Sequence, residues 1–365
     1  CEVELRRMLA EDLLDSRTRL QRAASQFHGE RLLGPKLAIV NPPLWEMGHV
    51  GWFQERWCLR WRADGQLEDS LLGGADRLYD SSTVAHDTRW DLPLPSLQAT
   101  REYLANVLER VLERLAREPG NAKLRYFVRL ATFHEDMHAE AFRYTCQTLG
   151  YPDPVGLDFS SRDFRSVELG KDLEFNESRF ILGAQPGGHE FVFDNEKWAH
   201  EVELAPFRIS RAPVSNAQFL AFVEQGGQAP RYWKKIDGAW MERRFDALQP
   251  LEGDEPVRHV DWNEAQAYCR WAKRRLPSEA QWQCASSKPA FRWGNTWEWT
   301  ASSFVPYPGF APDPYEDYSV PWFGTHKVLR GASFATPRRL VSPAFRNFYL
   351  ADRGDVFSGF RTCAL

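Results

Sequence analysis

Three histidines of this sequence have the spacing of metal ligands. His134 and His138 are four residues apart, and they continue an apolar stripe that runs through positions 124, 127, 128, 131 and 142. His49 lies on the inward stripe of a second predicted helix, among aromatic residues. Since residues three or four apart share one face of a helix, we expect all three imidazoles to face the same interior.

Three inward imidazoles favour a metal site over a set of ordinary core histidines. A single buried histidine is usually a hydrogen-bonded part of the core, but three of them without a metal would leave polar groups unpaired. Neutral imidazole is also the commonest side-chain metal ligand. Because no ligand carboxylate is evident, zinc and ferrous iron both remain open, and a three-ligand site of either kind can accept a substrate or O2.

The same segment also matches the H-E-x-x-H pattern of zinc metalloproteases. In that interpretation Glu135, between His134 and His138, is the general base. The extended form of the pattern needs another histidine six residues after the second one, and this chain has Tyr144 there. The third candidate ligand lies upstream instead, so the pattern gives little support to a protease.

Four predicted helices position these histidines. Helical periodicity predicts helices over residues 2–27, from about Asn41 onward, over 96–117 and over 121–150. Asn41 is expected to cap the second helix, with Pro42 and Pro43 in its first turn. A long crossover separates the second helix from the third. Four amphipathic helices connected in this way predict a four-helix bundle.

The second half of the chain has the pattern of a mixed domain. Short alternating runs at 179–182 and 200–204 predict strands, and two short helices are expected at 215–224 and 263–274. We therefore expect an α+β protein of two domains. These are a metal-binding four-helix bundle at 1–155, a linker at 156–175 and a mixed α+β domain at 176–365. A length of 365 residues suits two domains.

Composition excludes several classes of protein. Lys+Arg is 46 and Asp+Glu is 50, which gives a net charge of −4 and argues against a nucleic-acid-binding surface. No apolar stretch is long enough to predict a membrane span. The 6 cysteines are scattered without a Cys-x-x-Cys pair, which is typical of a reducing cytoplasm. We expect a cytoplasmic enzyme with small-molecule substrates, as a monomer or weak homodimer.

Several motifs resemble the ergothioneine sulfoxide synthases. Residues 41–54, 78–90 and the pair His134 and His138 are similar to the DinB-like domain of these enzymes. The second half resembles their partner domain, which is related to the formylglycine-generating enzyme and has a C-type-lectin-like fold. The segments that carry this second resemblance are 193–196, 275–282, 293–300, 306–310, 329–334 and 357–361. Both domains in this order make the resemblance specific.

The resemblance implies a non-haem iron enzyme. In such an enzyme His49, His134 and His138 would bind Fe(II), and O2 would be a co-substrate. The family joins a chalcogen atom to the imidazole C2 of hercynine, which is trimethylated histidine, or of histidine itself. Aromatic faces are natural partners for a quaternary ammonium group, and aromatic residues make up 14% of this chain.

The resemblance also implies substrate-binding positions. Arg89 would contact the donor substrate through an anionic group or a sugar hydroxyl, with a solvated salt bridge as the competing interpretation. Arg353 has the same two interpretations. Tyr307 and Asn347 would line the hercynine pocket, although a turn role for Tyr307 competes. Met137 stands where some relatives carry a glutamine that contacts hercynine.

Two departures from the family pattern concern the donor and the oxygen chemistry. Members that use γ-glutamylcysteine have the loop Arg-Asn-Trp-Asp, and this chain has Phe348 and Tyr349 in the last two places. A phenol cannot replace a carboxylate against an ammonium group. Phe304 occupies the place of a proton-donating tyrosine, so Phe304 and Tyr307 are the positions at which catalysis is expected to differ.

These departures favour selenoneine synthase, a branch that uses hercynine and a selenosugar. A sulfur-using synthase that takes cysteine or γ-glutamylcysteine is the first alternative. A DinB-type thiol S-transferase, which would prefer zinc and need no O2, is the second, and a catalytically inactive binding module is the third. Formylglycine-generating chemistry is not expected because Cys269, Cys284 and Cys363 are isolated from one another in the sequence.

Overall fold

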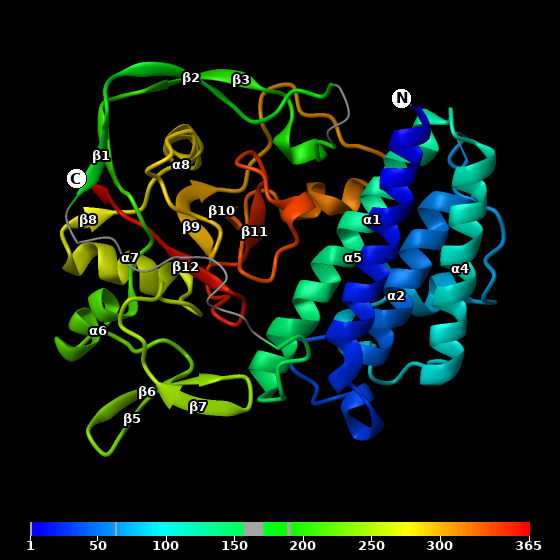
Figure 1. Cartoon of the computed structure of the whole chain (residues 1–365), viewed down its shortest axis with the longest axis horizontal. Helices are drawn as coiled ribbons and strands as arrows, with labels where there is room; N and C mark the ends of the chain where they lie inside the picture. The colour runs from blue at the N-terminus through cyan, green and yellow to red at the C-terminus, as the bar shows by residue number, and fades with distance from the viewer. Residues whose placement is uncertain (1, 63, 157–170, 188–190) are drawn as a thin grey trace. The chain divides into compact units, whose positions relative to one another are not determined.

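The computed structural model describes residues 2–62, 64–156, 171–187 and 191–365. Contacts divide the chain into two compact units, Cys1–Gly156 and Leu157–Leu365. The first unit is helical and the second mixes short strands with short helices (Figure 1). The prediction of a two-domain α+β protein is therefore confirmed. The part of the predicted linker at 157–170 lies outside the described residues.

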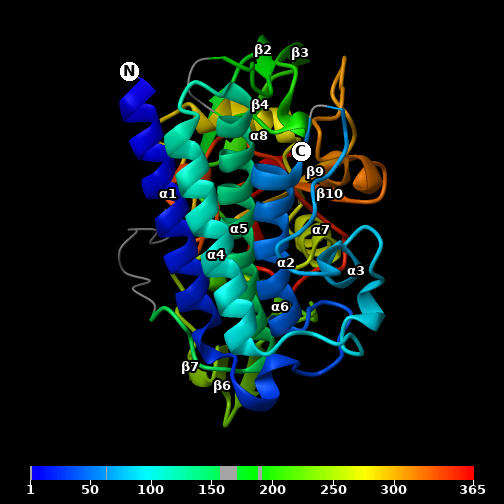
Figure 2. The same cartoon turned by 90° about the vertical axis from the view of Figure 1, so that its right-hand side faces the viewer.

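Four helices form the first unit. They are α1 (Glu2–Ala23), α2 (Pro43–Glu55), α4 (Leu97–Arg117) and α5 (Ala122–Leu149). Helix α1 packs along α5, and α2 packs against both α4 and α5, so the four run side by side (Figure 2). The crossover from α2 to α4 contains a π-helical turn at Arg56–Arg60, the short helix α3 (Ala75–Tyr79) and a 3₁₀ turn at His86–Thr88.

Capping residues account for the starts of α4 and α5 and for the end of α5. The Ser96 hydroxyl accepts from Ala99 N at the start of α4, and the Asn121 side chain accepts from Leu124 N at the start of α5. Gly150 ends α5 with a φ of 69°, which suits glycine. The expectation for Asn41 is wrong. Pro42 occupies the capping position of α2 without a side-chain bond, and Oδ1 of Asn41 instead accepts from the Arg89 guanidinium.

The first helix is shorter than its pattern predicts. It ends at Ala23 and continues into two 3₁₀ turns, Ala24–Gln26 and Gly29–Leu32. Met8, which belongs to the apolar pattern, is 41% exposed. The buried side of α1 includes Leu13 and Arg17, and Arg17 forms a buried ion pair with Glu135 of α5.

Within its described residues, the second unit contains two four-stranded sheets and two smaller ones. The first sheet has the order β1 (Asp172–Phe175), β4 (Phe207–Ser210), β13 (Cys363–Ala364) and β8 (Arg274–Arg275). The second has the order β11 (Asn347–Tyr349), β10 (Lys327–Gly331), β9 (Trp297–Ser303) and β12 (Ser358–Phe360). Strand β1 lies inside the range expected to be a linker. Strands β9 and β12 are parallel, and the other pairs of these two sheets are antiparallel.

Two strands and two helices of the second unit agree with the sequence patterns. The predicted strands are β2 (Ser178–Leu182) and β3 (His200–Leu204), which form a two-stranded sheet. The predicted helices are α6 (Asn216–Glu224) and α7 (Trp262–Trp271), and each begins with a capping box. Helix α8 (Glu279–Ser286) and the three-stranded sheet β5 (Trp233–Ile236), β6 (Ala239–Arg244) and β7 (Ala247–Pro250) complete the unit.

Two global properties agree with the composition. None of the helices in the described part of the chain combines the length and the apolar character that a membrane crossing requires. The cysteines at 58, 146, 269, 284 and 363 are free thiols. Cys269 lies on α7, Cys284 on α8 and Cys363 on β13.

Candidate metal centre

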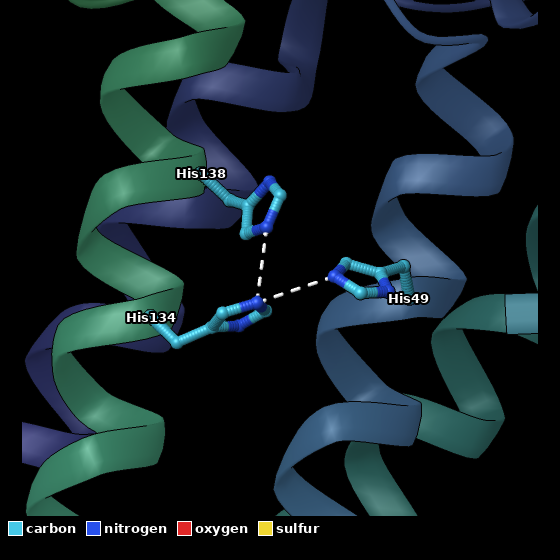
Figure 3. Close-up of side chains that lie close together, drawn as sticks. All are labelled: His49, His134 and His138. Carbon is cyan, nitrogen blue, oxygen red and sulfur yellow. Dashed lines mark hydrogen bonds between the residues drawn. The ribbon is translucent and has the colours of Figure 1, made fainter. Parts of the chain in front are cut away.

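Helices α2 and α5 bring the three predicted ligands together. The Nε2 atom of His134 lies 3.2 Å from Nε2 of His49 and 3.2 Å from Nε2 of His138. One ligand atom from each residue lies within 4.8 Å of the others. Figure 3 shows the rings of His134 and His138 projecting from one helix toward the ring of His49 on another. The periodicity that placed all three on one interior face therefore led to a real cluster.

Hydrogen bonds at the far side of two rings fix where their protons are. His49 Nδ1 lies 2.8 Å from the carbonyl oxygen of Tyr79, and His138 Nδ1 lies 2.6 Å from Oε1 of Glu46. A carbonyl or a carboxylate oxygen can only accept, so each Nδ1 carries the proton and donates it. In the neutral rings, both Nε2 atoms are then lone-pair acceptors directed toward His134.

His134 cannot satisfy both of these lone pairs. If its proton is on Nε2, it can be donated to one neighbour only. Its Nδ1 is buried and has no hydrogen-bond partner among the described residues. A cation that accepts the three Nε2 lone pairs resolves this mismatch. Metal–nitrogen bonds of about 2.0–2.1 Å separate two ligand nitrogens by roughly 3.0–3.4 Å, and the observed 3.2 Å fits.

Burial keeps the ligand rings neutral. It lowers the pKa of His49 and of His134 well below the ordinary value, and the nearby His138 ring lowers both further. Metal binding needs the neutral imidazole, so both residues are ready to bind at pH 7. The Phe53 ring stacks on His134 with centroids 3.7 Å apart, and Trp45 stacks on His49 at 5.0 Å. These contacts limit how far either ring can rotate.

A close approach of backbone to ring places the Tyr79 carbonyl. Helix α2 has a glycine at position 48, and a Cβ there would lie 2.2 Å from Cζ of Tyr79. Only glycine therefore lets the Tyr79 ring rest against the helix one residue before His49. The carbonyl that accepts from His49 belongs to this same residue.

The metalloprotease interpretation lacks its general base. Glu135 is completely buried, and it accepts from Arg17 Nε at 2.5 Å. The same guanidinium donates to the backbone carbonyl of Leu104. Glu135 thus joins α5 to α1 and α4, and its carboxylate is already used inside the bundle.

The sequence patterns missed the residues that bind the far nitrogens of the ligands. Glu46 precedes His49 by one helical turn, yet its partner His138 is 92 positions away. One signal was available in the sequence, because Glu46 is a carboxylate among the largely apolar and aromatic residues 43–53, a segment that the structure buries. A buried carboxylate must find a donor. Tyr79 contributes through its backbone, which has no signature in the sequence.

Arg89 is buried in the helical unit. Its guanidinium donates to Asn41 Oδ1 at 2.7 Å and to the Val84 carbonyl at 3.2 Å. It also lies 3.9 Å from the centroid of the Trp45 ring. Within the described ranges Arg89 has no ion pair with a carboxylate, and burial lowers its pKa to about 10. Met137, also expected near a substrate, is half-buried on α5 beside His138.

The other predicted site residues belong to the second unit. Tyr307 is 5% exposed. Its hydroxyl donates to Glu279 Oε2 at 3.0 Å and accepts from Arg330 at 2.8 Å. Burial raises the pKa of Tyr307. Phe304 is fully buried and stacks on Phe348, with centroids 4.1 Å apart.

Strand β11 and the loop after it contain the remaining predicted residues. Asn347 accepts from the backbone N–H of Phe348 through its side chain. The Arg353 guanidinium donates twice to Asp355, at 2.6 and 2.8 Å. It also lies 5.1 Å from the centroid of the Tyr349 ring. The structure therefore brings Phe304 to Phe348, and Tyr349 to Arg353.

Two family models match the chain. The sulfatase-modifying factor enzyme 1-like domain matches residues 178–294 and 291–364, and the DinB superfamily matches 12–142. Among curated proteins, the hercynine oxygenase of Mycolicibacterium thermoresistibile is 30% identical over 97% of this chain and 94% of its own length. That of Mycolicibacterium smegmatis is 30% identical over 98% of each chain.

A more distant relative covers less of the chain. The formylglycine-generating enzyme of Streptomyces coelicolor is 28% identical over 40% of this chain and 73% of its own length. Both hercynine oxygenases match this chain nearly end to end, and both domains occur in the expected order. This chain therefore belongs to the hercynine oxygenase family, oxidative enzymes in which a DinB-superfamily domain precedes a sulfatase-modifying factor enzyme 1-like domain.

Proposed function

We propose that this enzyme uses iron and O2 to join a sulfur atom to the imidazole C2 of hercynine and forms a sulfoxide. The observation that carries the proposal is the convergence of three imidazole nitrogens, from one buried and two half-buried histidines, in a chain that matches hercynine oxygenases almost end to end. Forming the C–S bond removes two electrons, and oxidising the sulfur removes two more. O2 accepts all four, with one oxygen atom entering the sulfoxide and the other leaving as water.

The metal-binding residues contribute preorganisation. His49, His134 and His138 present neutral lone pairs to one point, and the stacked Trp45 and Phe53 rings restrict two of the imidazoles. Iron bound there would supply redox chemistry with O2 and would favour the deprotonated form of a thiol. Three neutral nitrogens also suit zinc, so iron is inferred from the family rather than from the ligand set.

We assign the second-unit residues to substrate positioning. Tyr307 would act as a support, since its hydroxyl is already bonded to Glu279 and Arg330. Phe304 has no proton to donate. Asn347, Phe348 and Tyr349 on β11 would contact the substrates, together with Arg353. In the first unit, Arg89 and Met137 would contact substrates from the bundle.

The decisive experiment supplies substrates to protein of defined metal content. Protein loaded anaerobically with Fe(II) receives hercynine, then O2 and a donor, either cysteine or γ-glutamylcysteine. Mass spectrometry should detect a hercynine sulfoxide conjugate. Metal-free protein and the His138→Ala variant are the controls and should give none. A zinc-loaded protein that turns over without O2 would instead identify a thiol S-transferase. No product with any donor would refute the proposal.

A selenosugar is the second candidate donor, and one observation favours it. The Arg353 guanidinium donates two hydrogen bonds to Asp355, and the phenol of Tyr349 offers no carboxylate to an ammonium group. An uncharged sugar would need neither charge. A competition assay with equal amounts of selenosugar and γ-glutamylcysteine tests this. A selenium-containing product in excess supports the selenosugar, and sulfoxide alone rejects it.

A further inference from the structure

The three imidazoles of the metal centre differ in what their Nδ1 atoms face. His138 donates to the carboxylate of Glu46, and His49 donates to the neutral carbonyl of Tyr79. His134 Nδ1 has no hydrogen-bond partner within the described ranges. The cluster thus contains one anionic, one neutral and one missing partner. This asymmetry does not follow from the identity of the ligands, which are all histidines.

The partner of Nδ1 controls how strongly Nε2 donates electrons. A hydrogen bond to a carboxylate pulls the Nδ1 proton away from the ring and makes the opposite nitrogen a stronger donor. The effect is greater where water is excluded, because charge-assisted bonds strengthen at low dielectric. Glu46 is 2% exposed and its bond to His138 is 2.6 Å long. A backbone carbonyl has a smaller effect because it carries no net charge.

We infer that Glu46 is a positioning residue that makes His138 the strongest electron donor of the three ligands and stabilises the oxidised form of the bound metal. The inference rests on the metal site of the proposed function. Glu46 also joins the two helices that supply the ligands, since it lies on α2 and its partner lies on α5. The order of donor strength is then His138, His49 and His134.

The substitution Glu46→Gln separates charge from shape. The amide oxygen can still accept from His138 Nδ1, so the ring stays in place while the negative charge is lost. Removing such a partner typically weakens metal affinity about 10–100-fold. We expect a loss of this size for Co(II) and Fe(II) in competition with a chelator. The iron midpoint potential should rise, and the visible spectrum of the Co(II) protein should shift. Glu46→Asp, which keeps the charge, should restore part of the affinity.

Glu55→Gln is the matched control. Glu55 lies on the same helix, is 1% exposed, and binds Tyr103 and Ser70 instead of a histidine. This variant should lose stability while its folded fraction keeps wild-type metal affinity and potential. Circular dichroism of metal-free protein establishes that each variant is folded.

The outcomes distinguish the inference from the proposed function. A folded Glu46→Gln protein with wild-type affinity, potential and spectrum overturns the role of Glu46. An equal loss in Glu55→Gln also overturns it, because the effect would then be a general consequence of a weakened bundle. Wild-type protein that binds neither Co(II) nor Fe(II) would refute the metal site itself.

Discussion

The two units each contain a buried polar cluster, and the clusters differ in how their donors and acceptors match. In the second unit, Arg346 donates twice to Glu279 and once to the carbonyl of Asn195. Tyr307 completes this group with a bond to the same carboxylate. In the helical unit, by contrast, three ring nitrogens face one another with at most one proton between them. The first arrangement pairs its charged groups with one another and leaves Arg330 Nε without a partner among the described residues. The second leaves nitrogen lone pairs facing one another, which a cation could accept.

This difference separates a polar core from a binding site. Buried polar groups cost free energy unless they are paired. A cluster whose members pair with one another stabilises the fold. A cluster with unmatched lone pairs can instead bind a cation. Charge content alone would have pointed to the wrong place, since the second-unit cluster contains more ionised groups.

Disrupting the polar cluster around Glu279 in the second unit should have the largest effect on the free energy of unfolding. In Glu279→Gln, Arg330 and Arg346 lose the carboxylate that both contact. Removing one partner of a buried ion pair costs about 3–5 kcal/mol. Denaturant unfolding followed by tryptophan fluorescence should show a loss of this size, with metal affinity of the folded protein unchanged. The exposed pair of Glu4 and Arg7 is the control, and Glu4→Gln should leave stability unchanged. A loss of metal affinity in Glu279→Gln would contradict the separation of the two clusters.

Removing one proposed metal ligand should have the reverse effect: metal affinity should fall while the metal-free protein stays folded. His138→Ala eliminates a donor nitrogen and should weaken metal binding by more than about 100-fold, since loss of a ligand exceeds loss of its hydrogen-bond partner. Metal content after dialysis and product formation should both fall. The metal-free variant should remain folded, because the bundle loses one half-buried ring. Full iron content in this variant would show that His138 is not a ligand.

Moving a backbone partner should produce an intermediate effect. Gly48→Ala forces the Tyr79 ring away from α2 and displaces the carbonyl that accepts from His49. Overpacking of this kind costs about 1–3 kcal/mol, and metal affinity should fall with it. The control is Gly120→Ala, since a Cβ there meets nothing within 4 Å. Unchanged metal affinity in Gly48→Ala would show that the His49 ring does not depend on Tyr79.

The sequence predicted the cluster of three histidines better than the groups that bind their far nitrogens. Periodicity reports which face of a helix a residue occupies, and this was enough for His49, His134 and His138. Cap residues such as Ser96 and Asn121 also located helix ends. The pairing of Glu46 with His138 depends on how α2 and α5 pack, and no local pattern encodes packing between helices.

Other features were beyond sequence patterns for different reasons. The Tyr79 group that accepts from His49 is a backbone carbonyl. Every residue has one, so the residue type could not predict this hydrogen bond. Strand β1 is only four residues long and lies in a range that we expected to be a linker. Asn41 is a good cap by residue type. Its side-chain oxygen instead accepts a tertiary hydrogen bond from Arg89, so it does not cap the helix.

Lowering the pH should reduce the unfolding free energy of the metal-free protein through the histidine cluster of the helical unit. The folded-state pKa of His49 and of His134 lies well below the ordinary value of 6.5. The unfolded chain therefore binds more protons than the folded one below about pH 6.5, and stability falls as the pH falls. Two such groups should cost about 1 kcal/mol between pH 7 and pH 6.

The matched variant for this test is His49→Phe with His134→Phe, which removes both titrating rings. Its unfolding free energy should fall less over the same pH range than that of the metal-free wild-type protein. Saturating metal should stabilise the wild-type protein and leave the double variant unaffected. Equal pH dependence in the two proteins would mean that these histidines are already matched without a cation, which would remove the distinction between the two clusters.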